Sequence, residues 1–152
     1  MCVMHTLIRE CRKGRIPDIV AMAAKDEEID PGRLAWSIAQ GRVTIASNPR
    51  HAPRLVPIGD GCRVKVNVNV GTSGTMCDED LEIEKAKAAV AHHADALMDL
   101  STAGDLAGIR KRVLALGVPV GTVPIYEAVR RAGSAADVDA DLLFRVIREH
   151  CA

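Results

Sequence analysis

The sequence predicts an α/β protein: a mostly helical N-terminal domain, residues 1–61, followed by three β-α units in residues 62–152. Apolar residues recur at helical spacing through much of the N-terminal region. Residues 63–70 alternate strictly between valine and polar side chains, as a strand does. Strand, loop and helix patterns of similar length then repeat toward the C-terminus, which is typical of successive β-α units.

The N-terminal domain is expected to contain three short helices and one strand. Residues 1–14 have an amphipathic helical pattern, and a second helix begins after Pro17. Asp30 and Pro31 are typical of a helix N-cap and first turn, so a third helix begins there and stops near Gly41. A short strand, RVTIA, and a loop, SNPRHAPRLVPIGDG, complete the domain, and the prolines and glycines of the loop mark a boundary.

The C-terminal region is expected to alternate strands and helices. The predicted order is a strand (63–70), a helix (78–93), a strand (96–100), a helix (105–116), a strand in VPVGTVPI, a helical stretch from Tyr126 and a final helix in DVDADLLFRVIREH.

Asn69, Met98 and Tyr126 each lie at or just past a strand end, 29 and then 28 residues apart. This spacing favours the first three units of a (β/α)8 barrel, incomplete because a barrel takes roughly 200 residues or more. An open doubly wound sheet is less favoured, because GTSG lacks the GxGxxG pattern.

The alternation in residues 63–70 indicates a polar barrel interior. The four valines would face the surrounding helices, whereas Lys65, Asn67 and Asn69 would point into the lumen. Buried polar side chains need partners, so this lining suggests a polar ligand. Asn69 would lie nearest the C-terminal mouth, where barrel enzymes bind their substrates.

Charge and composition exclude several classes of protein. Twenty basic residues balance twenty acidic ones, so the chain has no electrostatic signature of a nucleic-acid or anionic-membrane partner. No apolar run reaches membrane-spanning length and the N-terminus lacks the pattern of a secretory signal, which indicates a cytoplasmic protein. The five cysteines are widely spaced and include no CxxC pair, so isolated free thiols are expected.

Four segments resemble the phosphomethylpyrimidine synthase family of thiamine biosynthesis. They are KVNVNVGTSG, ADALMDLSTAGDL, VPVGTVPIYEA and the N-terminal RKGRIPDIVAMAAKDEEIDPGRLAWSIAQGRVTIASN. The likeness covers nearly the whole chain in order, and the MDLST and GTVPIY blocks are highly specific together. The chain departs from the family pattern at His93, at Ala103 and in IASN, where a proline is lost.

The resemblance implies a radical S-adenosylmethionine lyase built on a (β/α)8 barrel and assembled as a homodimer. Such an enzyme converts aminoimidazole ribotide to 4-amino-5-hydroxymethyl-2-methylpyrimidine phosphate, using a 4Fe-4S cluster, S-adenosylmethionine and zinc. Matched motif to motif, the substrate-binding residues are Asn69, Met98 and Tyr126, and no catalytic residue is assigned. These are the same residues that spacing places at strand ends.

The metal ligands of that family have no counterpart in this sequence. The chain contains neither the CxxCxxxxC that holds the cluster nor the segment that carries the zinc histidines. It therefore looks truncated and is expected to be inactive alone. Two alternatives stay open: a non-catalytic remnant, and a 5-hydroxybenzimidazole synthase of the same family that acts on the same ribotide.

Each candidate site residue also has a purely structural interpretation. Asn69 could bond a loop backbone, Met98 could fill the core, and Tyr126 could begin a helix with its hydroxyl in water. Asp99, next to Met98, could cap the following loop or bind the ligand. The adjacent histidines at 92 and 93 cannot chelate one ion together, since neighbouring helical residues point about 100° apart.

Overall fold

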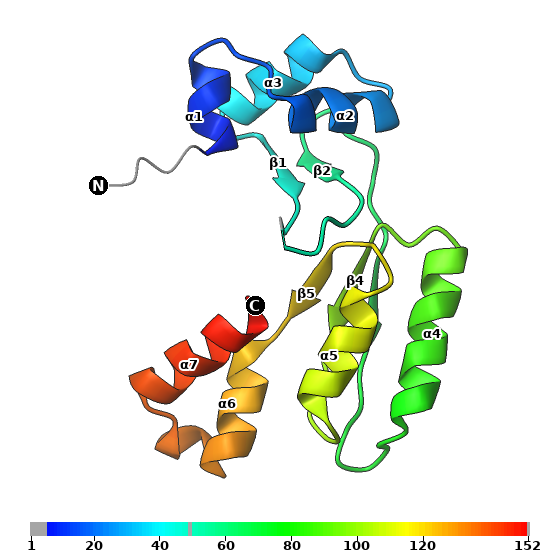
Figure 1. Ribbon diagram of the computed structural model, residues 1–152, viewed down its shortest axis with the longest axis vertical. Helices are drawn as coiled ribbons and strands as arrows, with labels where there is room; N and C mark the ends of the chain where they lie inside the picture. The colour runs from blue at the N-terminus through cyan, green and yellow to red at the C-terminus, as the bar shows by residue number, and fades with distance from the viewer. Residues whose placement is uncertain (1–5, 49, 152) are drawn as a thin grey trace. The chain divides into compact units, whose positions relative to one another are not determined.

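The computed structural model describes residues 6–48 and 50–151, which form two compact units. Residues 6–48 and 53–65 make the first unit, and residues 50–52 and 66–151 make the second. Figure 1 shows the helices and strands of both units, with labels on most of them. Within these ranges, no helix is both long and apolar enough to cross a membrane.

The first unit contains three short helices and a two-stranded ribbon. Its elements are α1 (Leu7–Arg12), α2 (Asp18–Asp26), α3 (Pro31–Ala39), β1 (Val43–Ala46) and β2 (Val56–Gly59). The start of α3 is confirmed, because the Asp30 carboxylate accepts a hydrogen bond from the Arg33 amide at 2.8 Å and Pro31 occupies the first turn. The first predicted helix is confirmed over the bounds of α1, and its residues 1–5 lie outside the described ranges.

The segment predicted as a loop, residues 47–61, contains the strand β2. This strand pairs antiparallel with β1, and Ile45 lies opposite Pro57. Prolines predict a loop because proline has no amide hydrogen to donate to a sheet. In a two-stranded ribbon both strands are edge strands, and an edge position tolerates proline. The prediction was wrong because it treated the prolines as excluding every kind of strand.

The second unit alternates strands and helices, as predicted. Its elements are β3 (Asn67–Val70), α4 (Glu79–Ala91), β4 (Ala96–Asp99), α5 (Leu106–Leu114), β5 (Val120–Thr122), α6 (Pro124–Ala132), the 3-10 helix η1 (Ala135–Asp137) and α7 (Ala140–His150). The strands form a parallel sheet of order β3-β4-β5. Asn69 lies opposite Met98, and Met98 lies opposite Gly121. A sheet of this kind is compatible with part of a (β/α)8 barrel, and the barrel itself stays a prediction.

One face of this sheet carries the core of the second unit. Helices α4 and α5 lie on that face (Figure 1), and Val70 and Leu97 are buried against them. Because successive strand residues point to opposite faces, Asn67 and Asn69 lie on the other face, where both are exposed. The sheet therefore has an apolar side covered by helices and an open side that bears amides.

The polar strand is shorter than the alternation predicts. Pairing begins at Asn67, and the preceding Val64 and Val66, expected to face the helices, are 89% and 55% exposed. Lys65, expected to point into the lumen, instead places its ammonium 2.6 Å from a carboxylate oxygen of Glu27. The Glu27 side chain is almost fully buried, and a buried carboxylate needs a partner of opposite charge. This ion pair, rather than strand alternation, sets the direction of Lys65.

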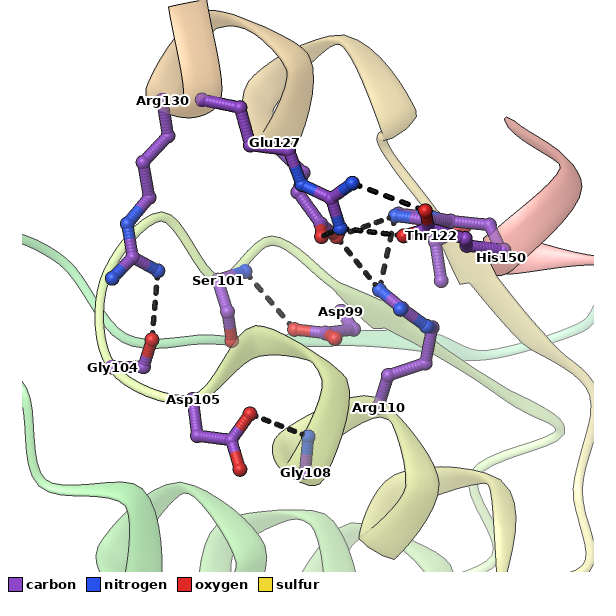
Figure 2. A network of polar contacts seen from close by, with 12 residues as sticks. Asp99, Ser101, Gly104, Asp105, Gly108, Arg110, Thr122, Glu127, Arg130 and His150 are labelled. Atoms are coloured by element: carbon purple, nitrogen blue, oxygen red, sulfur yellow. Dashed lines mark hydrogen bonds and ion pairs between the residues drawn. The ribbon is translucent and has the colours of Figure 1, made fainter. Parts of the chain in front are cut away.

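Aspartate side chains cap three helices of the second unit. The caps are Asp78, Asp105 and Asp139, and each accepts a hydrogen bond from the amide three residues later, at 3.0, 3.0 and 2.7 Å. Figure 2 shows this contact for Asp105 and Gly108. Each such cap contributes about 1 kcal/mol to helix stability. Helix α6 has no side-chain cap of this kind and begins at Pro124.

Gly71, directly after β3, should not tolerate a side chain. Its φ is 149°, and a Cβ there would lie 2.5 Å from the Ser101 amide nitrogen and 2.6 Å from the Leu100 carbonyl carbon. We expect Gly71→Ala to lower the free energy of unfolding by about 2 kcal/mol or more, because backbone atoms must move apart. Chemical denaturation of the chain measures this change. Gly74→Ala, at a position with open space around it, is the matched control, and equal losses in both variants would contradict the prediction.

Candidate functional site

Two of the three predicted site residues lie side by side at the carboxyl edge of the sheet. Asn69 of β3 and Met98 of β4 are register partners on the open face. Tyr126 lies in the first turn of α6, two residues into that helix, and is 45% exposed. No hydrogen bond joins its hydroxyl to another described residue. The structure thus brings Asn69 and Met98 together, whereas Tyr126 lies in the helix that follows β5 and has no polar contact with either of them.

A second amide orients Asn69. The side-chain nitrogen of Asn67 donates to Asn69 Oδ1 at 3.2 Å, along the open face of β3. This contact uses one of the two lone pairs of Asn69 Oδ1 and does not involve the NH2 group of Asn69, which can donate to a ligand. Met98 is partly buried beside it and presents a polarisable thioether. The pair offers one hydrogen-bond donor next to one soft apolar surface, which suits a small planar polar molecule.

The loops that follow β3 and β4 are fastened to each other. Thr72 is buried, its amide donates to the Ser101 hydroxyl at 3.2 Å, and its hydroxyl donates to the Ala103 carbonyl at 2.6 Å. The Thr102 amide in turn donates to the Thr72 carbonyl at 2.8 Å. These bonds hold the two strand ends, and therefore Asn69 and Met98, in fixed register.

Asp99 faces the helices and caps the loop after β4. It lies on the same side of its strand as the buried Leu97 and is 7% exposed. Its Oδ1 accepts a hydrogen bond from the Ser101 amide at 3.0 Å (Figure 2). Of the two interpretations that the sequence allows for Asp99, the structure shows the loop contact.

A buried carboxylate joins the three helices α5, α6 and α7. Glu127 of α6 accepts hydrogen bonds from Arg110 of α5 at 2.9 Å and from His150 of α7 at 2.8 Å (Figure 2). Arg131, one turn further along α6, also pairs with it. With Nε2 of His150 donating to Glu127, its Nδ1 accepts from the Thr122 hydroxyl at the end of β5, 2.9 Å away.

The environment of Glu127 keeps this carboxylate ionised. Burial alone would raise its pKa, but the hydrogen bonds from His150, Arg110 and Arg131 outweigh burial and lower the pKa from 4.5 to about 2. Thr122 lies on the helix-covered side of the sheet, because its register partner is Asp99. The network therefore lies behind the sheet and supports the first turn of α6, which carries Tyr126.

Sequence reasoning missed this network for a physical reason. Arg110 and His150 lie 17 and 23 residues from Glu127, so only the folded chain brings them together. The one local signal was the spacing of Glu127 and Arg131, four residues apart on a helix, where opposite charges pair. That spacing predicts an exposed pair and gives no indication of burial.

The described cysteines do not fit an iron–sulfur cluster. Cys11 and Cys62 are in the first unit, and burial raises the pKa of both thiols, which disfavours the thiolate that binds metal. Cys77 and Cys151 are exposed in the second unit, and Cys2 lies outside the described ranges. Within those ranges, no three His, Cys, Asp or Glu side chains form a group that could hold a metal ion.

Comparison with known proteins finds a family model and several relatives that match nearly the whole chain. The sequence model of the Radical SAM ThiC family matches residues 6–152. A phosphomethylpyrimidine synthase of Methanopyrus kandleri is 50% identical over 155 residues, and one of Thermus thermophilus is 46% identical over 151 residues; each alignment covers 95% of this chain. A 5-hydroxybenzimidazole synthase of Geobacter sulfurreducens is 40% identical over 154 residues, or 98% of this chain. The chain spans 35% of the length of each of these relatives.

The Glu127 network should make stability depend on pH in the acid range. Because the pKa of Glu127 is about 2 in the folded chain and 4.5 ordinarily, its stabilisation is complete above pH 4.5 and is lost as pH falls from 4.5 to 2. We expect Glu127→Gln to destabilise the chain at pH 7 and its difference from the wild type to shrink toward pH 2. Thermal unfolding across this range measures both.

The matched control for this prediction is Glu84→Gln, which removes an exposed carboxylate that pairs with Lys87 on α4. Exposed pairs contribute little, so this variant should follow the wild type at every pH. A constant difference between Glu127→Gln and the wild type from pH 7 to pH 2 would show that the charge of Glu127 is not what stabilises the three helices.

Proposed function

The chain belongs to the Radical SAM ThiC family, and on that premise we propose that it forms the substrate-binding part of a phosphomethylpyrimidine synthase. The reaction proposed for the whole enzyme converts aminoimidazole ribotide to 4-amino-5-hydroxymethyl-2-methylpyrimidine phosphate. The observation that supports this most directly is the pairing of Asn69 with Met98 on the open face, at the carboxyl edge of a parallel sheet. Parallel β-α folds bind their ligands at this edge.

Each proposed substrate contact follows from the chemistry of its side chain. The NH2 group of Asn69 donates a hydrogen bond to a polar edge of the ribotide, since the contact with Asn67 engages the oxygen of Asn69 and not its nitrogen. The thioether of Met98 packs against the imidazole ring, because sulfur makes favourable contacts with planar aromatic groups. The phenol of Tyr126 offers the ribotide both stacking area and a hydroxyl. The three contacts together recognise a planar ring with polar substituents.

The open face of the sheet belongs, in this proposal, to the interior of a (β/α)8 barrel. Exposed amides on β3 are then lumen residues, and the other strands of the barrel enclose the ligand above them. The radical chemistry of the family needs a 4Fe-4S cluster and S-adenosylmethionine, and the described residues of this chain do not fit the cluster. We therefore assign the chain no step of that chemistry and no zinc ligand. The homodimer implied by the resemblance and the cytoplasmic location predicted from the sequence are part of the same proposal.

A second function shares the same site. The Geobacter sulfurreducens relative, 40% identical over 98% of the chain, is named a 5-hydroxybenzimidazole synthase. In that alternative the same residues bind the same ribotide and the product differs. A non-catalytic remnant is the third candidate, and it would bind no ribotide.

A chimeric enzyme tests the proposed function. In it, this chain replaces the segment of the Methanopyrus kandleri enzyme with which it aligns at 50% identity. We expect the chimera to form the pyrimidine phosphate from aminoimidazole ribotide, and Asn69→Ala to lower its kcat/KM by roughly 10- to 100-fold, the effect of one lost hydrogen bond to substrate. Product analysis by mass spectrometry separates the pyrimidine from the benzimidazole.

The control variant is Gln40→Ala, which removes an exposed amide at the end of α3 and should leave the rate unchanged. A folded chimera that makes neither product would reject both enzymatic functions. Formation of 5-hydroxybenzimidazole would replace the first function by the second. If the Asn69→Ala chimera were as active as its parent, Asn69 would not be a substrate-binding residue.

A further inference from the structure

Gly121 leaves a space on β5 that the side chain of Met98 fills. The two residues are register partners on neighbouring strands. A Cβ built on Gly121 would lie 2.8 Å from both Sδ and Cε of Met98. Non-bonded carbon atoms approach to about 3.5–4.0 Å, so the thioether occupies the place that any other residue would need for its side chain.

The backbone gives no other reason for a glycine at this position. Gly121 does not have the positive φ that favours glycine, in contrast to Gly71 and Gly117. A glycine inside a strand weakens it, because it has no side chain to pack and loses more conformational freedom than other residues. What the glycine provides here is the close approach of the Met98 thioether to the β5 backbone.

The position of the thioether decides how much of the open face stays accessible. Asn69, Met98 and Gly121 form one row across the three strands. With its end over Gly121, the Met98 side chain leans toward β5 and away from the amide of Asn69. A methyl group on Gly121 would displace the thioether toward Asn69 or outward from the sheet. In either position the thioether would occupy space that a ring bound to Asn69 needs.

We propose that Gly121 is a positioning residue that holds the Met98 thioether against β5 and so leaves room for the planar ring of the substrate beside Asn69. The ligand assignment rests on the proposed function, whereas the contact between Gly121 and Met98 does not. Gly121 itself touches no substrate and acts through Met98.

The contact is tested on the 152-residue chain without ligand. Methionine labelled with 13C at the ε-methyl gives one signal for each of the five methionines, and the variant Met98→Leu identifies the signal of Met98. Gly121→Ala should shift the Met98 methyl signal and leave the other methionine signals in place. Gly74→Ala, where an added Cβ meets nothing within 4 Å, should shift none of them. An unchanged Met98 signal in Gly121→Ala would overturn the proposal.

The consequence for binding is tested in the chimera described above. Gly121→Ala should raise KM for aminoimidazole ribotide about tenfold while the thermal midpoint stays equal or rises, since alanine strengthens a strand relative to glycine. The effect should vanish in a Met98→Ala background, because two residues that act through one contact are not additive. A tenfold loss that persists without the Met98 side chain, or an unchanged KM, would overturn the positioning role.

These results separate this proposal from the proposed function. A wild-type chimera without activity would contradict the substrate assignment alone. The Gly121–Met98 contact is tested independently, by the methyl signal of the chain without ligand. A lower thermal midpoint in Gly121→Ala with an unshifted methyl signal would mean that Gly121 serves the fold and not Met98, which also rejects the proposal.

Discussion

The parallel pairing of β3, β4 and β5 is the constraint on which the candidate site depends. Strand alternation sends Val70 and Leu97 into the core under α4 and α5, and the same alternation leaves Asn69 and Met98 on the open face. A slip of one residue in either strand would exchange the two faces. The bonds between the loops at Thr72, Ser101 and Ala103 prevent such a slip at the edge where the ligand is proposed to bind.

The two layers of the second unit have different tasks. Behind the sheet, the ionised Glu127 joins Arg110, His150 and Arg131 from three helices and so fixes the uncapped start of α6. A buried carboxylate needs partners, because without them its burial costs several kcal/mol, and Glu127 has three. On the open face of the sheet, Asn67, Asn69 and Met98 offer uncharged amides and a thioether. The charged layer therefore supports the fold, and we propose that the neutral face recognises the ligand.

Sequence patterns predicted the local features of this fold and missed those that depend on distant contacts. The Asp30 cap, the β-α order and the pairing edge shared by Asn69 and Met98 follow from short-range rules. The direction of Lys65 does not, because it is set by Glu27, 38 residues away. The same holds for Glu127. The space over Gly121 is also invisible in the sequence, since only the register of β4 with β5 shows which side chain fills it.

We propose that the ribotide binds on the open face beside Asn69 and Met98. The most direct measurement is a crystal structure of the active chimera with aminoimidazole ribotide bound and the cluster left unreduced. We expect the Asn69 amide nitrogen to lie within about 3.2 Å of a polar atom of the ribotide and the Met98 sulfur to contact its ring. A ribotide bound elsewhere, with other strands of the enzyme packed directly on Asn69 and Met98, would show that this face is not the binding site.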